Sequence, residues 1–416
     1  MAVSISARTT FSLLYPEILT EFGWSRGMTA GAYSLGFIVS IAMLPVVGLL
    51  MERVGPRVVI PVGALLSAGG FLLLTVISDP IGLYVAMGLL IVNGSMASSY
   101  IVHSMFLPNW FVRNRGLAVG IAFSGVGVGA LIILPTFQYI IDFSGWRSAC
   151  INMAVLLVIL IIPLNLLFQR NSPQSIGLLP DGDSAPGGPG TQAPASGEVI
   201  LNQRWAQTEW TLARALSTVQ FWAMFTAMFC ALFVWYGVQA HQSKFLIDIG
   251  FAPSFAATML GLTAFFGIFG QIGIGALSDR IGRELAWTIA LAGFGTTSIL
   301  LILIAQTRSV ELVYLAMAVQ GLFGYGMSSL FGAIIAEVFA GKRVASILAF
   351  MGLGGNLGGG AGPWVLGLAH DAYGSYEIGF WICWIVSIIS IVCVWVVGPG
   401  RIRMVAGEAK ARARVN

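Results

Sequence analysis

The residues of this sequence that could bind a charged substrate in an apolar environment are few, and Arg8 is the first. It stands in a mostly apolar stretch that ends before Gly23, which follows Arg8 by 15 residues. Because a helix rises ~1.5 Å per residue, Arg8 would lie about 22 Å from the outer end of a helix over this stretch. A guanidinium matches a carboxylate in a bidentate geometry. We therefore expect Arg8 to bind a substrate anion, with an arginine that extends to lipid headgroups as the alternative.

Five further polar residues in mostly apolar runs are candidates for substrate contact: His241, Gln271, Asn93, Tyr325 and Asn356. The imidazole of His241 could also carry a proton, because histidine titrates near neutral pH. Buried polar side chains also join neighbouring helices, so helix packing is the alternative for each of the five. No spacing of His, Cys, Asp or Glu predicts a nucleophile or a metal site, and we expect neither an enzyme nor a bound metal or cofactor.

The elements that must position these residues are transmembrane helices. Hydrophobic residues make up 57% of the 416 residues and charged residues 9%, too few to cover a water-facing surface. Apolar runs of about 20 residues recur, and each can cross the bilayer as a helix, which satisfies its own backbone polar groups. We predict an all-α membrane protein with twelve transmembrane helices, at 1–22, 27–50, 57–78, 81–108, 115–141, 146–168, 218–246, 253–277, 284–306, 309–339, 343–369 and 376–399.

Lysine and arginine are unevenly distributed between the short loops. Loops that follow even-numbered helices carry Arg53, Arg57, Arg113, Arg115, Arg280, Arg283, Lys342 and Arg343, whereas the others carry only Arg26, Arg147 and Arg308. The positive-inside rule places the richer loops and both termini in the cytoplasm. The basic residues lie beside membrane spans, near anionic headgroups, which argues against a nucleic-acid partner. We expect a multi-pass protein of the plasma or cytoplasmic membrane, in contact with the lipid bilayer.

A repeat with an offset of 227 residues divides the chain into two homologous halves. GLLMERVGPR at Gly48–Arg57 corresponds to GALSDRIGRE at Gly275–Glu284. Parallel repeats of this kind are typical of one large class of secondary transporters. We predict six-helix bundles over 1–168 and 217–400, a flexible cytoplasmic linker rich in Pro, Gly and Ser over 169–216, and a basic cytoplasmic tail over 401–416.

The same offset predicts where the first helix should begin. The seventh helix begins near Ser217, and subtracting 227 places its counterpart about ten residues before Met1. Either the first helix is short at its cytoplasmic end, or the start methionine lies inside the gene. We expect the second explanation.

Two motifs carry a family resemblance. The loop pattern G-x-x-x-[D/E]-R-x-G-x-R at Gly48–Arg57 resembles the signature between helices 2 and 3 of the major facilitator superfamily. NRGLAVGIAFSG at Asn114–Gly125 is similar to the fifth-helix pattern of the monocarboxylate transporter family, although Ser124 departs from the expected alanine. The resemblance covers essentially the whole chain. It implies a bacterial-type relative of monocarboxylate carriers and oxalate/formate exchangers.

The charged residues of the two repeated loops are candidates for a conformational latch: Glu52, Arg53, Arg57, Asp279, Arg280 and Arg283. Pairs between them and helix ends would hold the cytoplasmic side closed and break on opening, whereas a topology signal with a turn is the alternative. Glu17 and Lys244 stand at equivalent repeat positions, since 17 + 227 = 244. A salt bridge between them at an outer gate is one hypothesis, and two independent solvated charges are the other.

The eighth helix departs from the family pattern. The resemblance implies a basic, carboxylate-binding residue four positions before the first glycine of the loop, where this chain has Gln271. Glutamine offers hydrogen bonds but no charge, so anion binding falls to Arg8, or the substrate is not a simple anion.

We predict a monomeric secondary transporter that moves a small organic anion, a carboxylate, by alternating access, with coupling to protons or by exchange. Two alternatives remain. One is an exporter of neutral or cationic small molecules, and the other is a transporter-like receptor that does not transport.

Overall fold

The computed structural model of the chain describes residues 1–24, 26–182, 199–341, 343–405 and 407–409. Eleven helices among these residues are long and apolar enough to cross a bilayer. The expected first span, 1–22, is divided at Thr10 into α1 (Ala2–Thr9) and α2 (Phe11–Phe22). The hydroxyls of Thr9 and Thr10 each donate to a backbone carbonyl three residues earlier, and hydroxyl bonds of this kind bend a helix.

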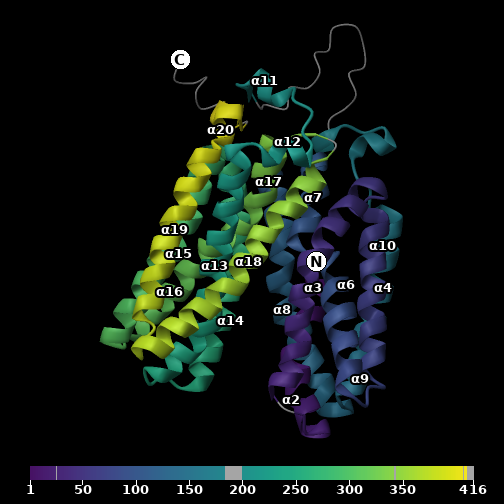
Figure 1. The fold of residues 1–416 in the computed structure, drawn as a ribbon, viewed down its shortest axis with the longest axis vertical. Coiled ribbons are helices and arrows are strands. Elements are labelled where there is room, and N and C mark those ends of the chain that lie inside the picture. The colour runs from purple at the N-terminus through teal and green to yellow at the C-terminus, as the bar shows by residue number, and fades with distance from the viewer. Residues whose placement is uncertain (25, 183–198, 342, 406, 410–416) are drawn as a thin grey trace. The chain divides into compact units, whose positions relative to one another are not determined.

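The described residues form two compact units. Unit 1 comprises Met1–Phe106 and Gly125–Ile176, and unit 2 comprises Leu107–Ser124 and Gly177–Asn416. The segment Leu107–Ser124 thus comes from the first half of the sequence but packs with the second half. Figure 1 shows the helices of unit 1 mainly in purple to blue and those of unit 2 mainly in teal to yellow.

Unit 1 is built from long helices interrupted by short irregular turns. After α1 and α2 its elements are α3 (Arg26–Arg53), α4 (Pro56–Leu74), α5 (Pro80–Leu83), the π-helix η1 (Tyr84–Ile91), α6 (Val92–Met96), the first part of α7 (Tyr100–Trp110), the later part of α8 (Arg115–Ser144), α9 (Trp146–Leu156), the π-helix η2 (Leu157–Ile161), α10 (Ile162–Phe168) and the 3-10 turn η3 (Pro173–Ile176).

Unit 2 contains the other long helices and a two-stranded sheet, in which β1 pairs antiparallel with β2. Its elements are the last part of α7, the first part of α8, the 3-10 turn η4 (Pro180–Gly182), β1 (Val199–Ile200), α11 (Gln203–Ala206), α12 (Leu212–Leu216), α13 (Val219–Asp248), α14 (Pro253–Ile281), α15 (Arg283–Thr307), α16 (Val310–Leu322), the 3-10 turn η5 (Gly324–Gly326), α17 (Met327–Val338), α18 (Val344–Tyr373), α19 (Glu377–Val397), α20 (Pro399–Ile402) and β2 (Arg403–Met404).

The predicted linker, 169–216, is structured at both of its ends, whereas its Pro- and Gly-rich centre, 183–198, lies outside the described residues. At the second end, the indoles of Trp205 and Trp210 pack against each other and against Phe339. The indole N–H of Trp205 also donates to the carbonyl of Val338 at 2.6 Å. This end of the linker is therefore fixed to the end of α17.

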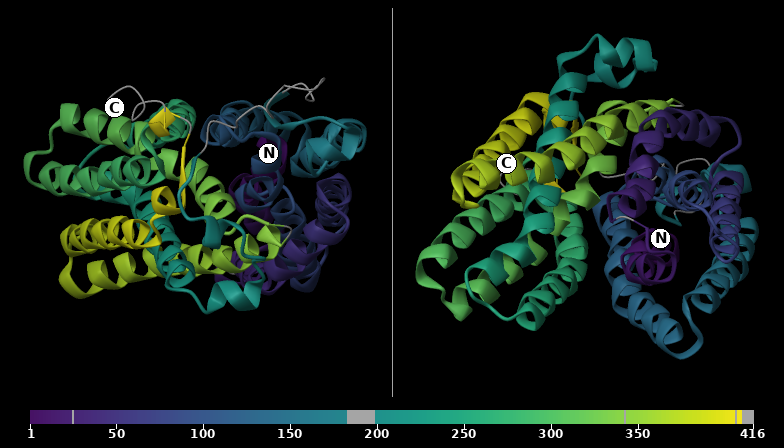
Figure 2. Two further views of the ribbon diagram at one scale, coloured as in Figure 1. Left: turned by 90° about the horizontal axis from the view of Figure 1, so that it is seen from above. Right: turned by 60° about the horizontal axis from the view of Figure 1, so that its bottom comes forward.

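The core of unit 2 depends on the close approach of α13 and α18, which lie side by side in Figures 1 and 2. A Cβ atom added at Gly358 of α18 would meet the backbone carbonyl oxygen of Phe229 on α13, and one added at Gly362 would meet that of Phe233. Small residues allow membrane helices to approach this closely. The glycine run of α18 thus serves helix packing.

An ion pair joins two helix ends in unit 1. Arg147 donates to both carboxylate oxygens of Glu21, at 2.6 and 2.7 Å, and the indole of Trp146 donates to the same carboxylate at 2.8 Å. Both charged side chains are about two-fifths exposed.

Substituting Glu21 by glutamine is expected to lower the free energy of unfolding by about 1 kcal/mol or less, because exposed ion pairs contribute little and are screened by salt. Thermal melting of the purified protein at low and high ionic strength measures this effect, which should shrink as salt rises. A large loss of stability that salt does not change would contradict the prediction.

Candidate functional site

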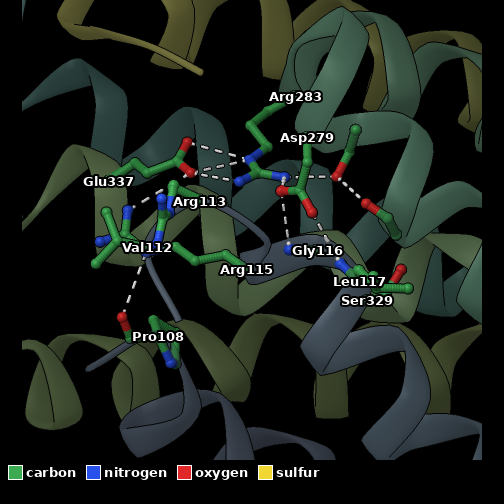
Figure 3. A network of polar contacts seen from close by, with 12 residues as sticks. Pro108, Val112, Arg113, Arg115, Gly116, Leu117, Asp279, Arg283, Ser329 and Glu337 are labelled. Carbon is green, nitrogen blue, oxygen red and sulfur yellow. Dashed lines mark hydrogen bonds and ion pairs between the residues drawn. The ribbon is translucent and has the colours of Figure 1, made fainter. Parts of the chain in front are cut away.

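A cluster of charged side chains lies buried in unit 2, at the turn between α14 and α15. Arg283 is 1% exposed, and its side chain lies between two carboxylates (Figure 3). Its Nε donates to Glu337 Oε1 at 2.9 Å and its Nη2 to the same oxygen at 2.6 Å. Its Nη1 donates to Asp279 Oδ1 at 2.8 Å and to the hydroxyl of Ser278. The guanidinium is thereby satisfied on both sides.

Asp279 has a second role, because its carboxylate caps the start of α8. Its two oxygens accept hydrogen bonds from the backbone N–H groups of Gly116 and Leu117, each at 3.0 Å. The first N–H groups of a helix lack partners within the helix, and the helix dipole favours a negative charge there. A residue of the second repeated loop therefore holds a helix that begins in the first half of the sequence.

A second arginine completes the cluster. Nη1 of Arg115, the first residue of α8, lies 3.6 Å from Glu337 Oε1, and its Nε donates to the carbonyl of Pro108 at 3.4 Å. Two arginines and two carboxylates therefore share one buried site, and their formal charges cancel. Such a cluster is stable only while all of its members are in place, because an uncompensated buried charge is costly.

The predicted latch residues divide into two groups. The structure brings Asp279 and Arg283 together, whereas Arg280 of the same loop is exposed. In the first repeated loop Arg53 and Arg57 are exposed, Glu52 is half-buried, and Nε of Arg57 donates to the carbonyl of Leu166 at 2.8 Å.

The outer-gate hypothesis concerned Glu17 and Lys244, which belong to different units. The ammonium of Lys244 pairs with Asp248, one turn further along α13, at 2.5 Å. Glu17 is half-exposed on α2. The salt bridge between Glu17 and Lys244 stays a prediction.

The fourth and tenth predicted spans are interrupted at corresponding positions. In unit 1, α6 ends at Met96 and α7 begins at Tyr100, whereas in unit 2, α16 ends at Leu322 and α17 begins at Met327. The two restarts differ by 327 − 100 = 227 residues, which is the offset of the repeat. Paired breaks in corresponding membrane helices are typical of substrate sites in transporters.

At the break in unit 2, polar side chains form a connected chain. The hydroxyl of Tyr325 donates to Gln239 Oε1 at 3.2 Å, and its ring lies 4.3 Å from that of Trp235. The backbone carbonyl of Tyr325 accepts from the Ser328 hydroxyl at 2.9 Å, and the amide of Gln271 donates to that hydroxyl at 3.3 Å. Two predicted substrate residues, Tyr325 and Gln271, are thereby linked.

Two asparagines, Asn93 and Asn356, are predicted to contact substrate, and their amide groups differ in their surroundings. Asn93 donates to the carbonyl of Gly88 at 2.7 Å and accepts from the hydroxyl of Ser40 at 3.2 Å, so its amide joins α3 to α6 and the π-helix before it. The buried Nδ2 of Asn356 has no hydrogen-bond partner among the described residues. The amide of Asn93 is therefore occupied, whereas substrate contact through Asn356 stays a prediction.

The imidazole of His241 connects α13 to α18. Its Nε2 lies 2.8 Å from the carbonyl oxygen of Pro363, and because a carbonyl only accepts, this nitrogen carries the hydrogen. Its ring also packs against Tyr376, with the ring centroids 5.3 Å apart. These contacts fit the packing alternative, and a role for His241 in substrate binding stays a prediction.

Arg8 lies at the last turn of α1, directly before the division at Thr10. Its guanidinium lies over the ring of Phe37 on α3, 5.4 Å from the ring centroid. The rings of Phe11 and Tyr33 stack beside this pair, with their centroids 5.0 Å apart. The half-buried cation thus stands among aromatic rings in unit 1.

Sequence reasoning missed Glu337 and the contact of Arg115 with it in the buried cluster. Glu337 is an acidic residue inside an apolar run, and intramembrane acids are functional candidates by default, so its position was a usable signal. The offset gives a second signal, because 337 − 227 = 110 and 283 − 227 = 56, where the first half has Trp110 and Pro56. The first half of the chain therefore lacks the counterparts of both Arg283 and Glu337.

Comparison with known proteins gives the family. The family model described as Major Facilitator Superfamily matches residues 1–329 and 248–413. The chain belongs to the Major Facilitator Superfamily. The all-α fold with twelve transmembrane helices in two six-helix repeats is confirmed, and the chain is a multi-pass membrane transporter with a small-molecule substrate.

Curated relatives within the Major Facilitator Superfamily are carriers of organic acids by name. Monocarboxylate transporter 13 of Rattus norvegicus is 27% identical over 89% of this chain and 80% of its own length. Monocarboxylate transporter 11 of Homo sapiens is 29% identical over 89% and 75%. The oxalate:formate antiporter of Oxalobacter formigenes is 21% identical over 82% and 75%.

Solved structures of the superfamily share the fold. The E. coli fucose:proton symporter is similar at a TM-score of 0.67 with 16% identity, over 95% of both chains. The proton:xylose symporter XylE is similar at a TM-score of 0.69 with 13% identity, over 99% of this chain and 98% of the other.

Proposed function

We propose that this transporter moves a small carboxylate across the membrane by alternating access. The observation that carries the proposal is Arg8, a half-buried cation among aromatic rings in the first helix of a chain related to monocarboxylate transporters. A charged side chain within the bilayer is costly and usually faces a cavity or a partner. A guanidinium binds a carboxylate through two parallel hydrogen bonds.

The substrate site in unit 2 would be the polar chain at the break before α17. Tyr325 and Gln271 offer hydrogen bonds without charge, and Asn356 offers an N–H group. His241 would contribute a proton or a hydrogen bond. In unit 1, Arg8 would supply a positive charge for the anion, and Asn93 would support the helix break.

The buried cluster at the turn between α14 and α15 would be the latch of the cytoplasmic gate. While Asp279 caps α8, the start of that helix is held to unit 2. When the cavity opens inward, these contacts break and the charges gain water. Arg53, Arg57 and Arg280 would act as topology signals at the cytoplasmic surface, with Glu52 beside them.

Proton coupling or exchange would drive transport, and we propose a monomer in the plasma or cytoplasmic membrane with both termini in the cytoplasm. The excess of Lys and Arg in the loops after even-numbered helices supports this orientation.

A second candidate function is export of a neutral or cationic compound. Its support is Gln271, an uncharged side chain in the helix that precedes the second repeated loop. In that case Arg8 would interact with lipid headgroups and would not contact substrate.

The test of the proposed function is binding of a panel of small carboxylates to the purified protein, measured by thermal shift. Ligands that bind the folded state raise its melting temperature. In the Arg8→Ala variant we expect carboxylate affinity to fall by about ten- to a hundredfold, because hydrogen bonds to charged groups contribute roughly 1.5–3 kcal/mol. Arg8→Lys should restore part of it, since lysine keeps the charge but loses the bidentate geometry.

The matched control is Arg204→Ala, which removes an exposed arginine of α11 and should leave the shift unchanged. Stabilisation of Arg8→Ala by carboxylates as strong as that of the parent would rule out Arg8 as the ligand. Stabilisation only by neutral or cationic compounds would favour the second candidate function.

A further inference from the structure

The central linker holds the connection between α7 and α8 through one carboxylate. The side chain of Asp181, in the turn η4, accepts hydrogen bonds from the backbone N–H of Val112 at 3.1 Å and of Arg113 at 3.0 Å. The guanidinium of Arg113 lies 3.7 Å from the same carboxylate, which is only 7% exposed. The composition of the linker predicts a flexible segment, yet these contacts fix the side chain of Asp181.

The backbone of Asp181 is itself unusual, because its φ is +60°. Only a few per cent of residues other than glycine adopt a positive φ, and aspartate is among those that tolerate it best. The chain thus takes a conformation that many side chains would disfavour, and it is the conformation that brings the carboxylate to Val112 and Arg113.

Two aspartates therefore bind backbone N–H groups of the segment from residue 112 to residue 117, which leads from the connection after α7 into α8. Asp181 binds the N–H groups of residues 112 and 113, and Asp279 binds those of residues 116 and 117. Arg115 lies between the two anchored points and faces Glu337. If α8 moves away from Asp279, the hydrogen bonds between Asp181 and residues 112 and 113 are therefore strained.

The far end of the linker is fixed close to the same cluster. Trp205 donates to the carbonyl of Val338, the neighbour of Glu337, and β1 pairs with β2 in the tail of the chain. The linker is thus attached to the gate region on both sides of residues 183–198.

We propose that the linker is part of the gate and that Asp181 is a positioning residue, which holds the connection between α7 and α8 in the closed state and releases it when α8 leaves Asp279. This inference rests on the proposed alternating access, but not on the identity of the substrate. The alternative is a contact that orders the loop locally and has no effect on the gate.

The test uses a cysteine at Val119, a completely buried residue in the first turns of α8. The rate at which a maleimide labels Val119→Cys reports how often this part of the helix is exposed. Adding Asp181→Ala should raise the rate about tenfold, because hydrogen bonds to a charged group are lost from the closed state only. Asp181→Asn keeps one acceptor oxygen and should give a smaller increase.

The matched control is Glu209→Gln, which changes an exposed acid of the same linker and should leave the labelling rate unchanged. Amide hydrogen exchange supplies a second readout that does not require transport. Loss of protection at residues 112 and 113 together with faster labelling at position 119 supports the proposal, whereas loss of protection confined to residues 112 and 113 overturns it.

This experiment is independent of the carboxylate panel. If the panel fails while Asp181→Ala still accelerates labelling, the substrate assignment is wrong and the gate inference stands. If carboxylates bind but labelling is unchanged in both Asp181 variants, the gate inference is wrong and the substrate assignment stands.

Discussion

Replacing Glu337 by alanine is expected to destabilise the protein by about 3–5 kcal/mol, the range found when one partner of a buried ion pair is removed. Glu337 neutralises Arg283 and faces Arg115, and its side chain is 1% exposed. Without it, two guanidinium groups remain buried with only Asp279 to balance them. Melting of the purified protein in detergent, followed by fluorescence, measures the loss.

The matched control is Glu311→Gln, which neutralises an exposed acid at the start of α16 and should change the melting temperature little. Glu337→Gln keeps hydrogen-bond acceptance without the charge, so its loss should be intermediate. The double variant Arg283→Ala, Glu337→Ala should lose less than the sum of the two single variants, because the second substitution removes the uncompensated charge. Additive losses would show that the two side chains are energetically independent.

Replacing Gly358 by alanine is expected to destabilise the protein by about 1–3 kcal/mol, the usual effect of overpacking a close contact. The added methyl group would meet the backbone carbonyl of Phe229, and a backbone cannot move aside as a flexible side chain can. This loss opposes the intrinsic preference of helices for alanine over glycine, which amounts to about 1 kcal/mol.

Gly360, two residues further along α18, is the control for this prediction. A Cβ atom added there meets nothing within 4 Å, so Gly360→Ala should leave stability unchanged or raise it slightly. Equal melting temperatures for Gly358→Ala and Gly360→Ala would mean that α13 and α18 are not held at this distance by their glycines.

The repeated loops illustrate how far the sequence goes in predicting the site. The pattern around Glu52 and Asp279 predicts two similar latches, yet among the described residues the buried cluster lies at the second loop. The difference is present in the sequence, since Pro56 and Trp110 stand where the second half has Arg283 and Glu337. This difference can be interpreted only once Glu337 is known to pair with Arg283, because 54 residues separate the two along the chain.

The candidate substrate residues show a different limit. The sequence identified Asn93, His241, Gln271, Tyr325 and Asn356 as polar residues in apolar helices, and it left binding and packing open for each. Hydrogen bonds distinguish them: the amide of Asn93 is engaged at a π-helix, and His241 donates to Pro363. Whether a polar side chain is satisfied depends on its neighbours from other helices, which hydropathy cannot reveal.

The sequence by itself determined the class of the protein, its twelve spans, its repeat and the positions of its few intramembrane charges. These follow from local rules, since hydrophobic length and the satisfaction of backbone hydrogen bonds within a helix do not depend on distant residues. Only the tertiary structure decided which charges meet. Asp279 reaches the N–H groups of residues 116 and 117, and Asp181 reaches those of residues 112 and 113, because folding brings together segments that are far apart along the chain. Their pairing is governed by burial and by the cost of an unbalanced charge, and both arise only once the helices have packed.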